Sequence, residues 1–357
     1  MKKNNLIINN QEISKDKPAY FIADIAANHD GDIERAKDLI FLAADAGADA
    51  AKFQHFKAES IVSDFGFKNL GDQLSHQSTW KKSVFDVYKD ASVNLDWTPI
   101  LKETCDEAKI TFFTSPYSLD IVDHIDPYVP AYKIGSGDIT WIEMIKHIAS
   151  KNKPYILATG ASSLLDVKRA VNAGLSINSM MCLMQCNTNY TASLENFKYL
   201  NLKVLHLYRD LFPDLLLGLS DHTPGSSSVL GAIALGAKMI EKHFTDDNNR
   251  IGPDHKFSMN PKSWKQMVLN VRELEYALGV PDKKVEDNEK ETVVVQRRAI
   301  CAAHQILAGK TLSEQDLSFL RPCPETAIPP YEIKKVIGKK LTKNVNKGQY
   351  IKWKDLK

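Results

Sequence analysis

The sequence lacks the long apolar segments that mark exported and membrane proteins. Its first residues, MKKNNLIINN, contain no apolar core of the length that a signal peptide needs. No apolar run elsewhere reaches the ~18 residues of a membrane-spanning helix. The five cysteines are an odd number and include no C-x-x-C pair, which argues against a disulfide framework. We therefore expect a cytoplasmic protein with free thiols and no membrane partner.

A charge excess of either sign is missing as well. Lysine and arginine total 46 and aspartate and glutamate total 44, which gives a net charge of +2 over 357 residues. This balance gives no indication of a nucleic-acid partner. Apolar residues make up 43% of the chain, an ordinary share for a globular protein, and the length is sufficient for a large domain and a small one.

The chain does contain a regular alternation of short apolar runs and amphipathic segments between about residues 18 and 280. Continuous apolar runs separated by helical patterns are typical of a parallel sheet that is covered on both faces. Eight such units in about 260 residues predict a (β/α)8 TIM barrel, an α/β fold, with an open doubly wound sheet as the alternative. The eight runs are residues 20–27, 50–56, 110–116, 131–137, 154–160, 180–186, 215–221 and 238–244.

Two segments depart from this rhythm. Residues 57–95 form a long insertion after the second run, which we expect to be an active-site loop or lid, or else an extra helix on the side of the barrel. Residues 281–296 begin with a polar charge run and are expected to link the barrel domain, residues 1–280, to a small β-rich module, residues 297–357.

The C-terminal module contains a weak internal repeat. The segments AGKTLSEQDL and KGQYIKWKDL share a glycine, an apolar residue three positions later, and Asp-Leu at seven and eight positions. This pattern predicts a module with pseudo-two-fold symmetry that is small enough to have only a limited core.

Two lysines stand where the predicted strands end, which is where barrels of this type place their active sites. Lys52 and Lys133 lie within otherwise apolar runs, and an unpaired charge there would be costly to bury. With neighbouring hydroxyls and glycine amides, the two lysines indicate a cradle for a phosphate or a carboxylate. The alternative is that each lysine is solvated at its strand end.

Two histidines close the last two runs. Because those strands are neighbours in a closed barrel, the imidazoles of His222 and His243 can face one point. Neutral imidazole is a common ligand of divalent metals, so the pair predicts an exchangeable metal site that water, a carboxylate or substrate completes. Taken alone, either histidine would more often be a hydrogen-bonded structural residue.

Several motifs follow one another in order across the predicted barrel. They read DIAANHDGD, GADAAKFQ, FFTSP, YKIGSGD, LATG, GLSDHTPG, IEKHFTDD and GPDHKFSMNP. Their set and order resemble the sialic acid synthase family, which condenses phosphoenolpyruvate with an N-acylated hexosamine. The segment RRAICAAHQILAGKTLSEQDLSFLRP resembles that family's antifreeze-like (SAF) domain. The resemblance covers about residues 18 to 357, nearly the whole chain.

The resemblance implies a reaction and a set of roles. The chain would form a nine-carbon 2-keto-3-deoxy sugar acid, sialic acid or a related nonulosonic acid, from phosphoenolpyruvate and a sugar like N-acetylmannosamine, with release of phosphate. His222 and His243 match the family's ligands for a divalent metal, usually manganese. The positions that match phosphoenolpyruvate-binding residues are Lys52, Thr114, Lys133, Ser136 and Ser220. The positions that match residues around the sugar are Gln54, Tyr190 and Asp254.

The same resemblance implies a domain-swapped homodimer. An arginine of the SAF domain would reach the sugar's N-acyl group in the partner subunit, and the run RAICAA favours Arg298 over Arg297. The reaction also needs a carboxylate to steer water and to balance a cationic centre, for which Asp24, Asp138 and Glu241 are the candidates.

Some positions depart from the family's pattern. The family usually has glutamate where this chain has Asp24 and Asp138, so both acids are one methylene shorter. These changes leave the identity of the sugar open. One alternative is a different phosphoenolpyruvate-condensing or aldolase-type barrel that makes a shorter sugar acid, although such an enzyme would not need a SAF module. The other is a sugar-binding homologue without catalysis, for which the two shorter acids are the only hint.

Overall fold

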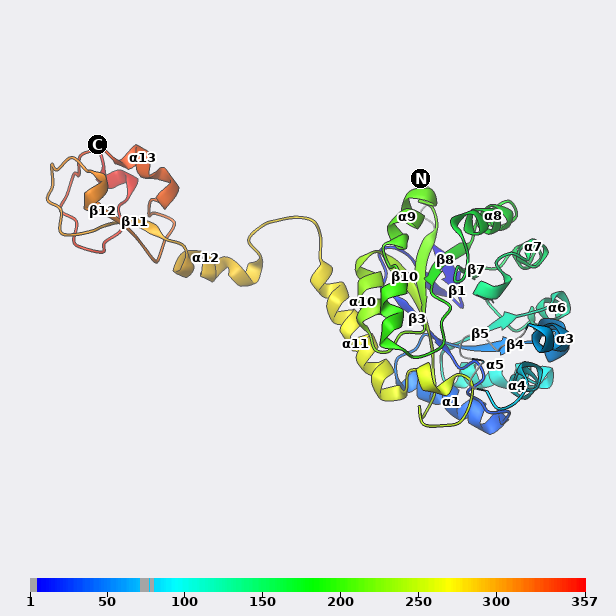
Figure 1. Ribbon diagram of the computed structural model, residues 1–357. Helices are drawn as coiled ribbons and strands as arrows, with labels where there is room; N and C mark the ends of the chain where they lie inside the picture. The colour runs from blue at the N-terminus through cyan, green and yellow to red at the C-terminus, as the bar shows by residue number, and fades with distance from the viewer. Residues whose placement is uncertain (1–4, 71–76, 78–79) are drawn as a thin grey trace. The chain divides into compact units, whose positions relative to one another are not determined.

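The computed structural model describes residues 5–70, 77 and 80–357, and the chain forms two compact units, Met1–Gly279 and Val280–Lys357. Each unit has its own hydrophobic core, and each is described here by itself (Figure 1). In the part of the chain that the structure describes, no helix is long and apolar enough to span a membrane. All five cysteines are free thiols, as the sequence predicts.

The first unit is built on eight parallel strands whose order in the sheet is their order in the chain. The last strand pairs with the first, so that Met239 lies beside Tyr20 and His243 beside Asp24. β5 and β6, at the two ends of the hydrogen-bonded order, also lie next to each other. This arrangement confirms the barrel and excludes the open sheet. The strands are β3 (Tyr20–Asp24), β4 (Ala50–His55), β5 (Thr111–Pro116), β6 (Tyr132–Ile134), β7 (Tyr155–Ala158), β8 (Met181–Cys186), β9 (Leu216–Asp221) and β10 (Ala237–His243).

Helices cover the outside of this barrel (Figure 1). Helix α1, for example, buries Ala36, Leu39, Ile40 and Ala43, the i, i+3, i+4, i+7 spacing of one helix face, in the cluster that contains the outward side chains of the strands. Its first turn is capped by the side chain of Asp32. The barrel helices are α1 (Ile33–Asp45), α5 (Thr98–Glu107), α6 (Leu119–Ile125), α7 (Ile142–Ser150), α8 (Leu164–Leu175), α9 (Val204–Leu211), α10 (Ser227–Ala234) and α11 (Pro261–Leu278).

An N-terminal hairpin packs with the barrel interior. β1 (Leu6–Ile8) and β2 (Gln11–Ile13) pair antiparallel, and Leu6, Ile8 and Ile13 share a core cluster with inward-facing strand residues such as Tyr20 and Met239. The sequence analysis did not predict these two strands, because three residues are too few to establish a periodicity.

The insertion after β4 contains three short helices, α2 (Ala58–Ile61), α3 (Asp64–Asn69) and α4 (Val84–Ala91). Part of the expected insertion, residues 71–76 and 78–79, lies outside the described residues. Phe56 anchors the described part, because its ring packs against those of Tyr88 and Tyr117 at centroid distances of 5.5 and 5.9 Å.

The second unit contains β11 (Ala299–Ala302), β12 (Leu317–Leu320), α12 (Lys290–Gln296) and α13 (Ile333–Val336). The two strands pair antiparallel, so the expected small β-rich module is confirmed. The internal repeat has matching structure in both copies. Gly309 and Gly348 take left-handed conformations with φ of 87° and 79°, and Asp316 and Asp355 each end a short 3₁₀ helix and are buried.

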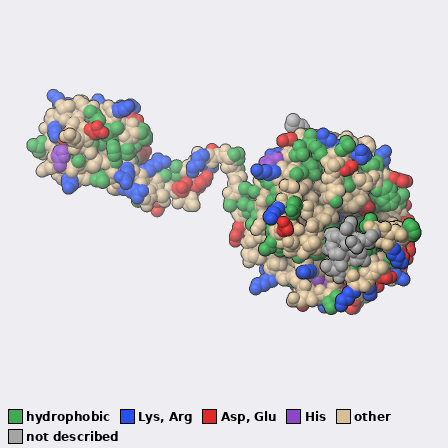
Figure 2. All heavy atoms as spheres, viewed as in Figure 1, with side chains coloured by type: hydrophobic (Ala, Val, Ile, Leu, Met, Phe, Trp, Pro, Cys, Tyr) green, Lys and Arg blue, Asp and Glu red, His purple; other side chains and the backbone are tan. Residues whose placement is uncertain are grey.

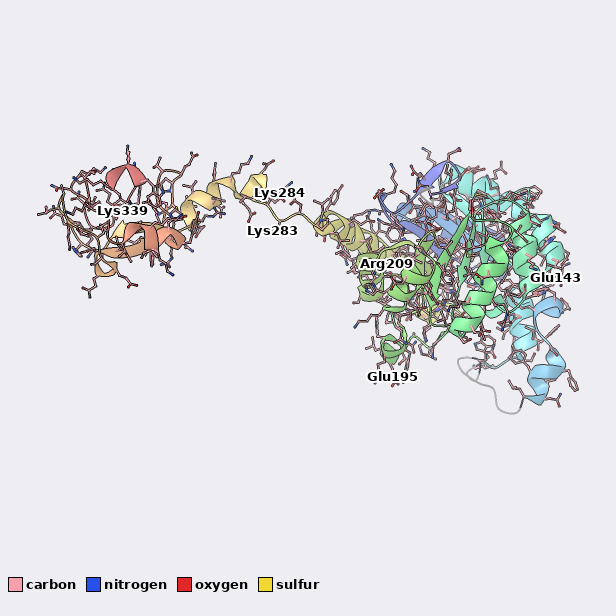
Figure 3. The ribbon with its side chains drawn as sticks, turned by 90° about the horizontal axis from the view of Figure 1, so that it is seen from above. Glu143, Glu195, Arg209, Lys283, Lys284 and Lys339 are labelled. Atoms are coloured by element: carbon pink, nitrogen blue, oxygen red, sulfur yellow. The ribbon has the colours of Figure 1, made fainter. Side chains whose placement is uncertain are left out.

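The segment expected to be a linker, residues 281–296, is partly helical, since α12 occupies its last seven residues. Lys283 and Lys284 lie on the irregular stretch before this helix (Figure 3). Over the visible face of the barrel unit, lysine and arginine side chains are interspersed with aspartate and glutamate, as the near-zero net charge leads one to expect (Figure 2).

Candidate active site

A cavity of about 450 Å³ opens at the carboxyl ends of the barrel strands. It is lined by most of the side chains that the sequence singled out. These are Asp24, Lys52, Gln54, Lys133, Ser136, Asp138, Tyr190, Ser220, His222, Glu241, His243 and Asp254. Strand alternation explains this convergence, because residues two apart on one strand share a face. Lys52 and Gln54 on β4, and Glu241 and His243 on β10, are such pairs.

Four charged side chains form the most deeply buried part of the cavity. Lys52 Nζ lies 2.7 Å from Asp24 Oδ2 and 3.6 Å from Glu241 Oε1, and Lys133 Nζ lies 2.6 Å from Glu241 Oε1. Burial alone would lower the pKa of Lys52, but Asp24 and Glu241 outweigh it and raise that pKa, so the ammonium stays charged. Both lysines are therefore buried and paired with carboxylates, and neither is solvated. Glu241 Oε2 is buried without a hydrogen-bond partner.

The two histidines lie side by side, with ring centroids 5.3 Å apart. His222 Nδ1 donates to the carbonyl oxygen of Asn187 over 3.0 Å. Burial would lower the pKa of His222, but its hydrogen bonds with the Cys186 side chain and with this carbonyl outweigh burial and raise that pKa. Burial lowers the pKa of His243 to about 3, so its imidazole is neutral. His243 Nδ1 is buried without a hydrogen-bond partner, 3.8 Å from Asp254 Oδ2.

These features fit a metal ligand pair, because the two imidazoles lie side by side at the cavity and one buried nitrogen of His243 is unsatisfied. Among the described residues, no group of three or more His, Cys, Asp or Glu side chains is arranged to hold a metal ion. Water or substrate would have to supply the remaining positions, as in an exchangeable site.

Tyr190 packs against this pair. Its ring centroid is 4.4 Å from that of His222 and 5.3 Å from that of Phe257, and burial raises its pKa well above 10. Gln54 Nε2 donates to Asp24 Oδ2 over 3.0 Å, and Asp254 Oδ2 accepts from the backbone of Ala27 over 3.2 Å. The predicted sugar-side residues thus adjoin both the charged cluster and the histidines.

Two predicted residues do not line the cavity. The Thr114 side chain faces out of the barrel, where it donates to the Phe53 carbonyl over 3.1 Å and contacts His55 Nδ1 at 2.6 Å. Its neighbour Ser115 pairs in register with Gln54 and lines the cavity instead, so the structure does not bring Thr114 to the cavity. Arg298 belongs to the second unit, where its Nη1 donates to the Phe319 carbonyl over 2.9 Å.

The insertion supplies a wall that the sequence analysis did not resolve. Tyr88 and Val87 on α4 and Ile61 on α2 all line the cavity. None of them lies on a strand, so strand periodicity gives no signal for them; the indication in the sequence was the run of aromatics in the insertion. The described residues between 56 and 91 that line the cavity are Phe56, Ile61, Gln77, Trp80, Val87, Tyr88 and Ala91.

The family of the chain follows from comparison with known proteins. A model described as the NeuB family matches residues 39–283, and one for the SAF domain matches residues 297–357. The chain is 33% identical to N,N'-diacetyllegionaminic acid synthase of Legionella pneumophila over 97% of this chain and 99% of that protein. The chain belongs to the NeuB family. It is an enzyme of that family, because relatives named as synthases extend over nearly its full length.

Three further proteins are similar to this chain to different degrees. Human N-acetylneuraminate-9-phosphate synthase is 30% identical over 94% of this chain and 91% of that protein. The solved structure of an N-acetylneuraminic acid synthetase from Leptospira borgpetersenii, in complex with citrate, superposes with a TM-score of 0.71 at 27% identity, over 82% of this chain and 95% of that one. A 3-deoxy-D-arabino-heptulosonate 7-phosphate synthase from Thermotoga maritima, at 16% identity and a TM-score of 0.56, shares the fold alone.

We expect Asp138→Asn to stabilise the protein at neutral pH. Burial raises the pKa of the Asp138 carboxyl from 3.8 to about 6, so the folded state holds this proton more tightly than the unfolded chain. Stability from this group therefore falls as pH rises from about 4 to above 6. The uncharged amide should gain about 1–3 kcal/mol at pH 7.5 and nothing at pH 4, measured by urea unfolding. Asp214→Asn, at an exposed position, is the control, and equal stability of wild type and Asp138→Asn at pH 7.5 would contradict the shift.

Proposed function

We propose that this protein condenses phosphoenolpyruvate with the open-chain form of an N-acylated hexosamine and releases phosphate, giving a nine-carbon 2-keto-3-deoxy sugar acid. The observation that carries the proposal is the meeting of two buried lysines and two adjacent histidines in one cavity of a NeuB-family barrel. Relatives named as legionaminic, pseudaminic and N-acetylneuraminate-9-phosphate synthases support it.

The reaction forms one carbon–carbon bond and breaks one carbon–oxygen bond. The methylene carbon of phosphoenolpyruvate attacks the aldehyde carbon of the sugar, whose oxygen takes up a proton. The former enol carbon becomes cationic, and water adds to it and loses a proton. The carbon–oxygen bond to the phosphate then breaks, inorganic phosphate leaves, and a keto group remains.

Lys52 and Lys133 bind the phosphate and carboxylate of phosphoenolpyruvate in this proposal. Their ammonium groups are already buried and oriented by Asp24 and Glu241, so little reorganisation accompanies binding. Hydroxyls of Ser136 and Ser220 line the same cavity and add hydrogen bonds. A charge-assisted bond of this kind contributes about 1.5–3 kcal/mol.

Three carboxyls adjoin the reacting centre, and their surroundings separate their roles. Asp24 and Glu241 are ion-paired with the lysines, and their carboxylates stabilise the transient cationic carbon. The pKa of Asp138 is raised to about 6 by burial and not by an ion pair. Near neutral pH this carboxyl can therefore take a proton from water.

A divalent ion, which we expect to be manganese, would be held by His222 and His243 and would polarise the aldehyde as a Lewis acid. The neutral state of His243 and its unsatisfied Nδ1 support this assignment. Tyr190 shields both rings from water on one side.

The composition of the cavity wall indicates which kind of sugar acceptor fits. In the described part of residues 56–91, no charged side chain lines the cavity, and among all described lining residues Lys52 and Lys133 are the only lysines or arginines. Both of these are committed to the deep cluster. A phosphate at the far end of the sugar would therefore face an apolar wall that includes Ile61 and Val87. This composition favours an unphosphorylated acceptor.

A second copy of the chain completes the site in our proposal. The segments that follow β4, β8 and β10 carry exposed large apolar side chains, namely Phe65, Leu194 and Ile251, the last 99% exposed. Exposed apolar side chains of this size fit a partner surface. The partner's SAF domain would cover them and direct its Arg298 to the N-acyl carbonyl, where a guanidinium is a strong donor.

The wild-type protein should release phosphate from phosphoenolpyruvate only when an N-acylated hexosamine is present. Among acceptors, an unphosphorylated sugar should exceed its 6-phosphate in kcat/KM by about tenfold or more, because a buried phosphate would lack a cation. A colorimetric phosphate assay over a panel of both kinds measures this. If no sugar causes release of phosphate, the proposed reaction is refuted. Preference for the 6-phosphate would refute only the argument from the composition of the cavity wall.

Metal binding should require both histidines. We expect the wild-type protein to bind one Mn²⁺ per chain by calorimetry and to lose turnover on chelation, with recovery on adding Mn²⁺ back. His222→Ala and His243→Ala should each weaken Mn²⁺ binding by about tenfold or more, because two ligands leave little redundancy. His206→Ala, on outer helix α9, is the matched control. Full turnover of a metal-free preparation would refute the assignment.

Completion of the site in trans predicts recovery of activity on mixing. Arg298→Ala and His243→Ala homodimers should each be nearly inactive. In a mixed dimer, one site carries both lesions and the other carries neither, so activity should return after subunit exchange. Exchange is confirmed by native mass spectrometry. If exchange occurs and activity stays absent, each SAF domain serves its own barrel and the trans arrangement is wrong.

A further inference from the structure

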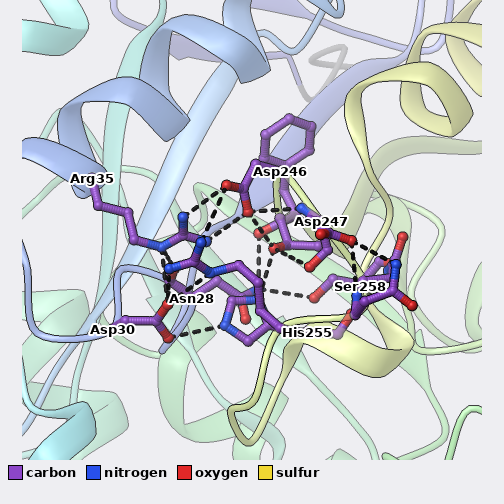
Figure 4. A network of polar contacts seen from close by, with 12 residues as sticks. Asn28, Asp30, Arg35, Asp246, Asp247, His255 and Ser258 are labelled. Carbon is purple, nitrogen blue, oxygen red and sulfur yellow. Dashed lines mark hydrogen bonds and ion pairs between the residues drawn. The ribbon is translucent and has the colours of Figure 1, made fainter.

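A ring of four charged side chains lies beside the cavity, on the loops that follow β3 and β10 (Figure 4). Asp30 Oδ2 lies 3.1 Å from Arg35 Nε and 3.0 Å from Arg250 Nη2. Arg35 in turn holds Asp246 through two parallel bonds of 2.7 and 2.6 Å, and the Asp246 pKa is lowered well below its usual range by this guanidinium. We call these four residues the acid–guanidinium ring.

His255 connects the acid–guanidinium ring to the cavity. Its side chain is fully buried, and both ring nitrogens are engaged: Nε2 lies 2.9 Å from Asp30 Oδ1 and Nδ1 lies 2.7 Å from Thr245 Oγ1 (Figure 4). The chain folds tightly over this imidazole, because a Cβ on Gly252 would lie 2.6 Å from His255 Cδ2. The loop from 252 to 258 is thus shaped around one side chain.

Asp254, the residue before His255, lines the cavity together with Pro253. Its Oδ2 accepts from Ala27 N and lies 3.8 Å from His243 Nδ1, while its carbonyl accepts from Ser258 Oγ over 2.6 Å. The backbone after Asp254 is also held by Asn248 Nδ2, which donates to the carbonyls of His255 and Ser258. Because His255 follows Asp254 directly and its imidazole bonds Asp30 and Thr245, a shift of that imidazole moves the Asp254 carboxylate.

We propose that His255 is a positioning residue: through Asp30 and Thr245 it sets the place of Asp254, and through Asp254 it controls use of the sugar acceptor. The proposal rests on the proposed function for its kinetic consequence. Its structural consequence, a displaced Asp254 when His255 loses a partner, does not depend on the reaction. Phosphoenolpyruvate binding, which the strand lysines provide, should be untouched.

The test compares two exchanges at one position. His255→Asn keeps a polar atom near that of Nδ1 and so retains the bond to Thr245, whereas His255→Leu loses both partners. We expect the acceptor KM to rise about tenfold or more in His255→Leu and less in His255→Asn, with the phosphoenolpyruvate KM unchanged in both. His147→Asn is the matched control, because His147 makes the same kind of contact, 2.8 Å to Asp123, on an outer helix.

A double substitution separates positioning from general damage. In an Asp254→Ala background, His255→Asn should cause no further rise in the acceptor KM, because the residue through which it acts is gone. Additive effects, or an equal rise in both KM values, would overturn the proposal. A crystal structure of His255→Asn supplies a readout that needs no turnover: Asp254 in its original place overturns the inference even if the enzyme acts as proposed. A displaced Asp254 in a protein that turns over no amino sugar would retain the positioning role and refute the proposed function alone.

Discussion

Two lysines and two carboxylates are buried together at the inner end of the cavity, and the rest of the site depends on the balance of their charges. An ammonium or carboxylate group taken out of water costs several kcal/mol unless a partner of opposite charge meets it. Here each lysine meets a carboxylate within 2.7 Å, and Glu241 serves both. The formal charges of the four side chains cancel before substrate binds. An anionic ligand therefore meets lysine ammonium groups that are already oriented.

A buried ion pair also fixes the positions of the two histidines. His222 and His243 each follow a residue whose side chain faces the other side of the sheet, and those two residues, Asp221 and Lys242, form a buried ion pair between β9 and β10. Ser228 and Thr223 donate to the same carboxylate. The outward ion pair locks the register of the two strands, and the inward imidazoles are held 5.3 Å apart as a consequence. A metal site with only two protein ligands needs such stiffness, since the ligands themselves form no closed shell.

The strand-borne part of this site could be predicted from sequence because alternation is a strong signal. Lys52, Lys133 and the histidines stand at the ends of apolar runs, and a parallel barrel brings all such ends to one face. The placement of Thr114 outside the cavity shows the limit of that signal. Two adjacent hydroxyl residues on β5 are equivalent in composition, and only the register with β4 decides that Ser115 faces inward. The β1–β2 hairpin and the wall from α2 and α4 show no periodicity in the sequence, so they could not be predicted. The ion pairs of the two lysines depend on the directions of side chains, which a sequence pattern does not specify.

The site thus has two parts of different mechanical character. Strands supply the lysines, the paired carboxylates and the histidines, and their positions are set by backbone ladders that tolerate little change. Loops supply Asp254, Asp138 and the wall around Tyr88, and their positions are set by side-chain contacts such as the acid–guanidinium ring. In the proposed reaction, the first kind of support holds phosphoenolpyruvate and the second holds the sugar acceptor. The two aspartates also differ in support, because Asp24 lies 2.7 Å from Lys52, whereas burial alone raises the pKa of Asp138.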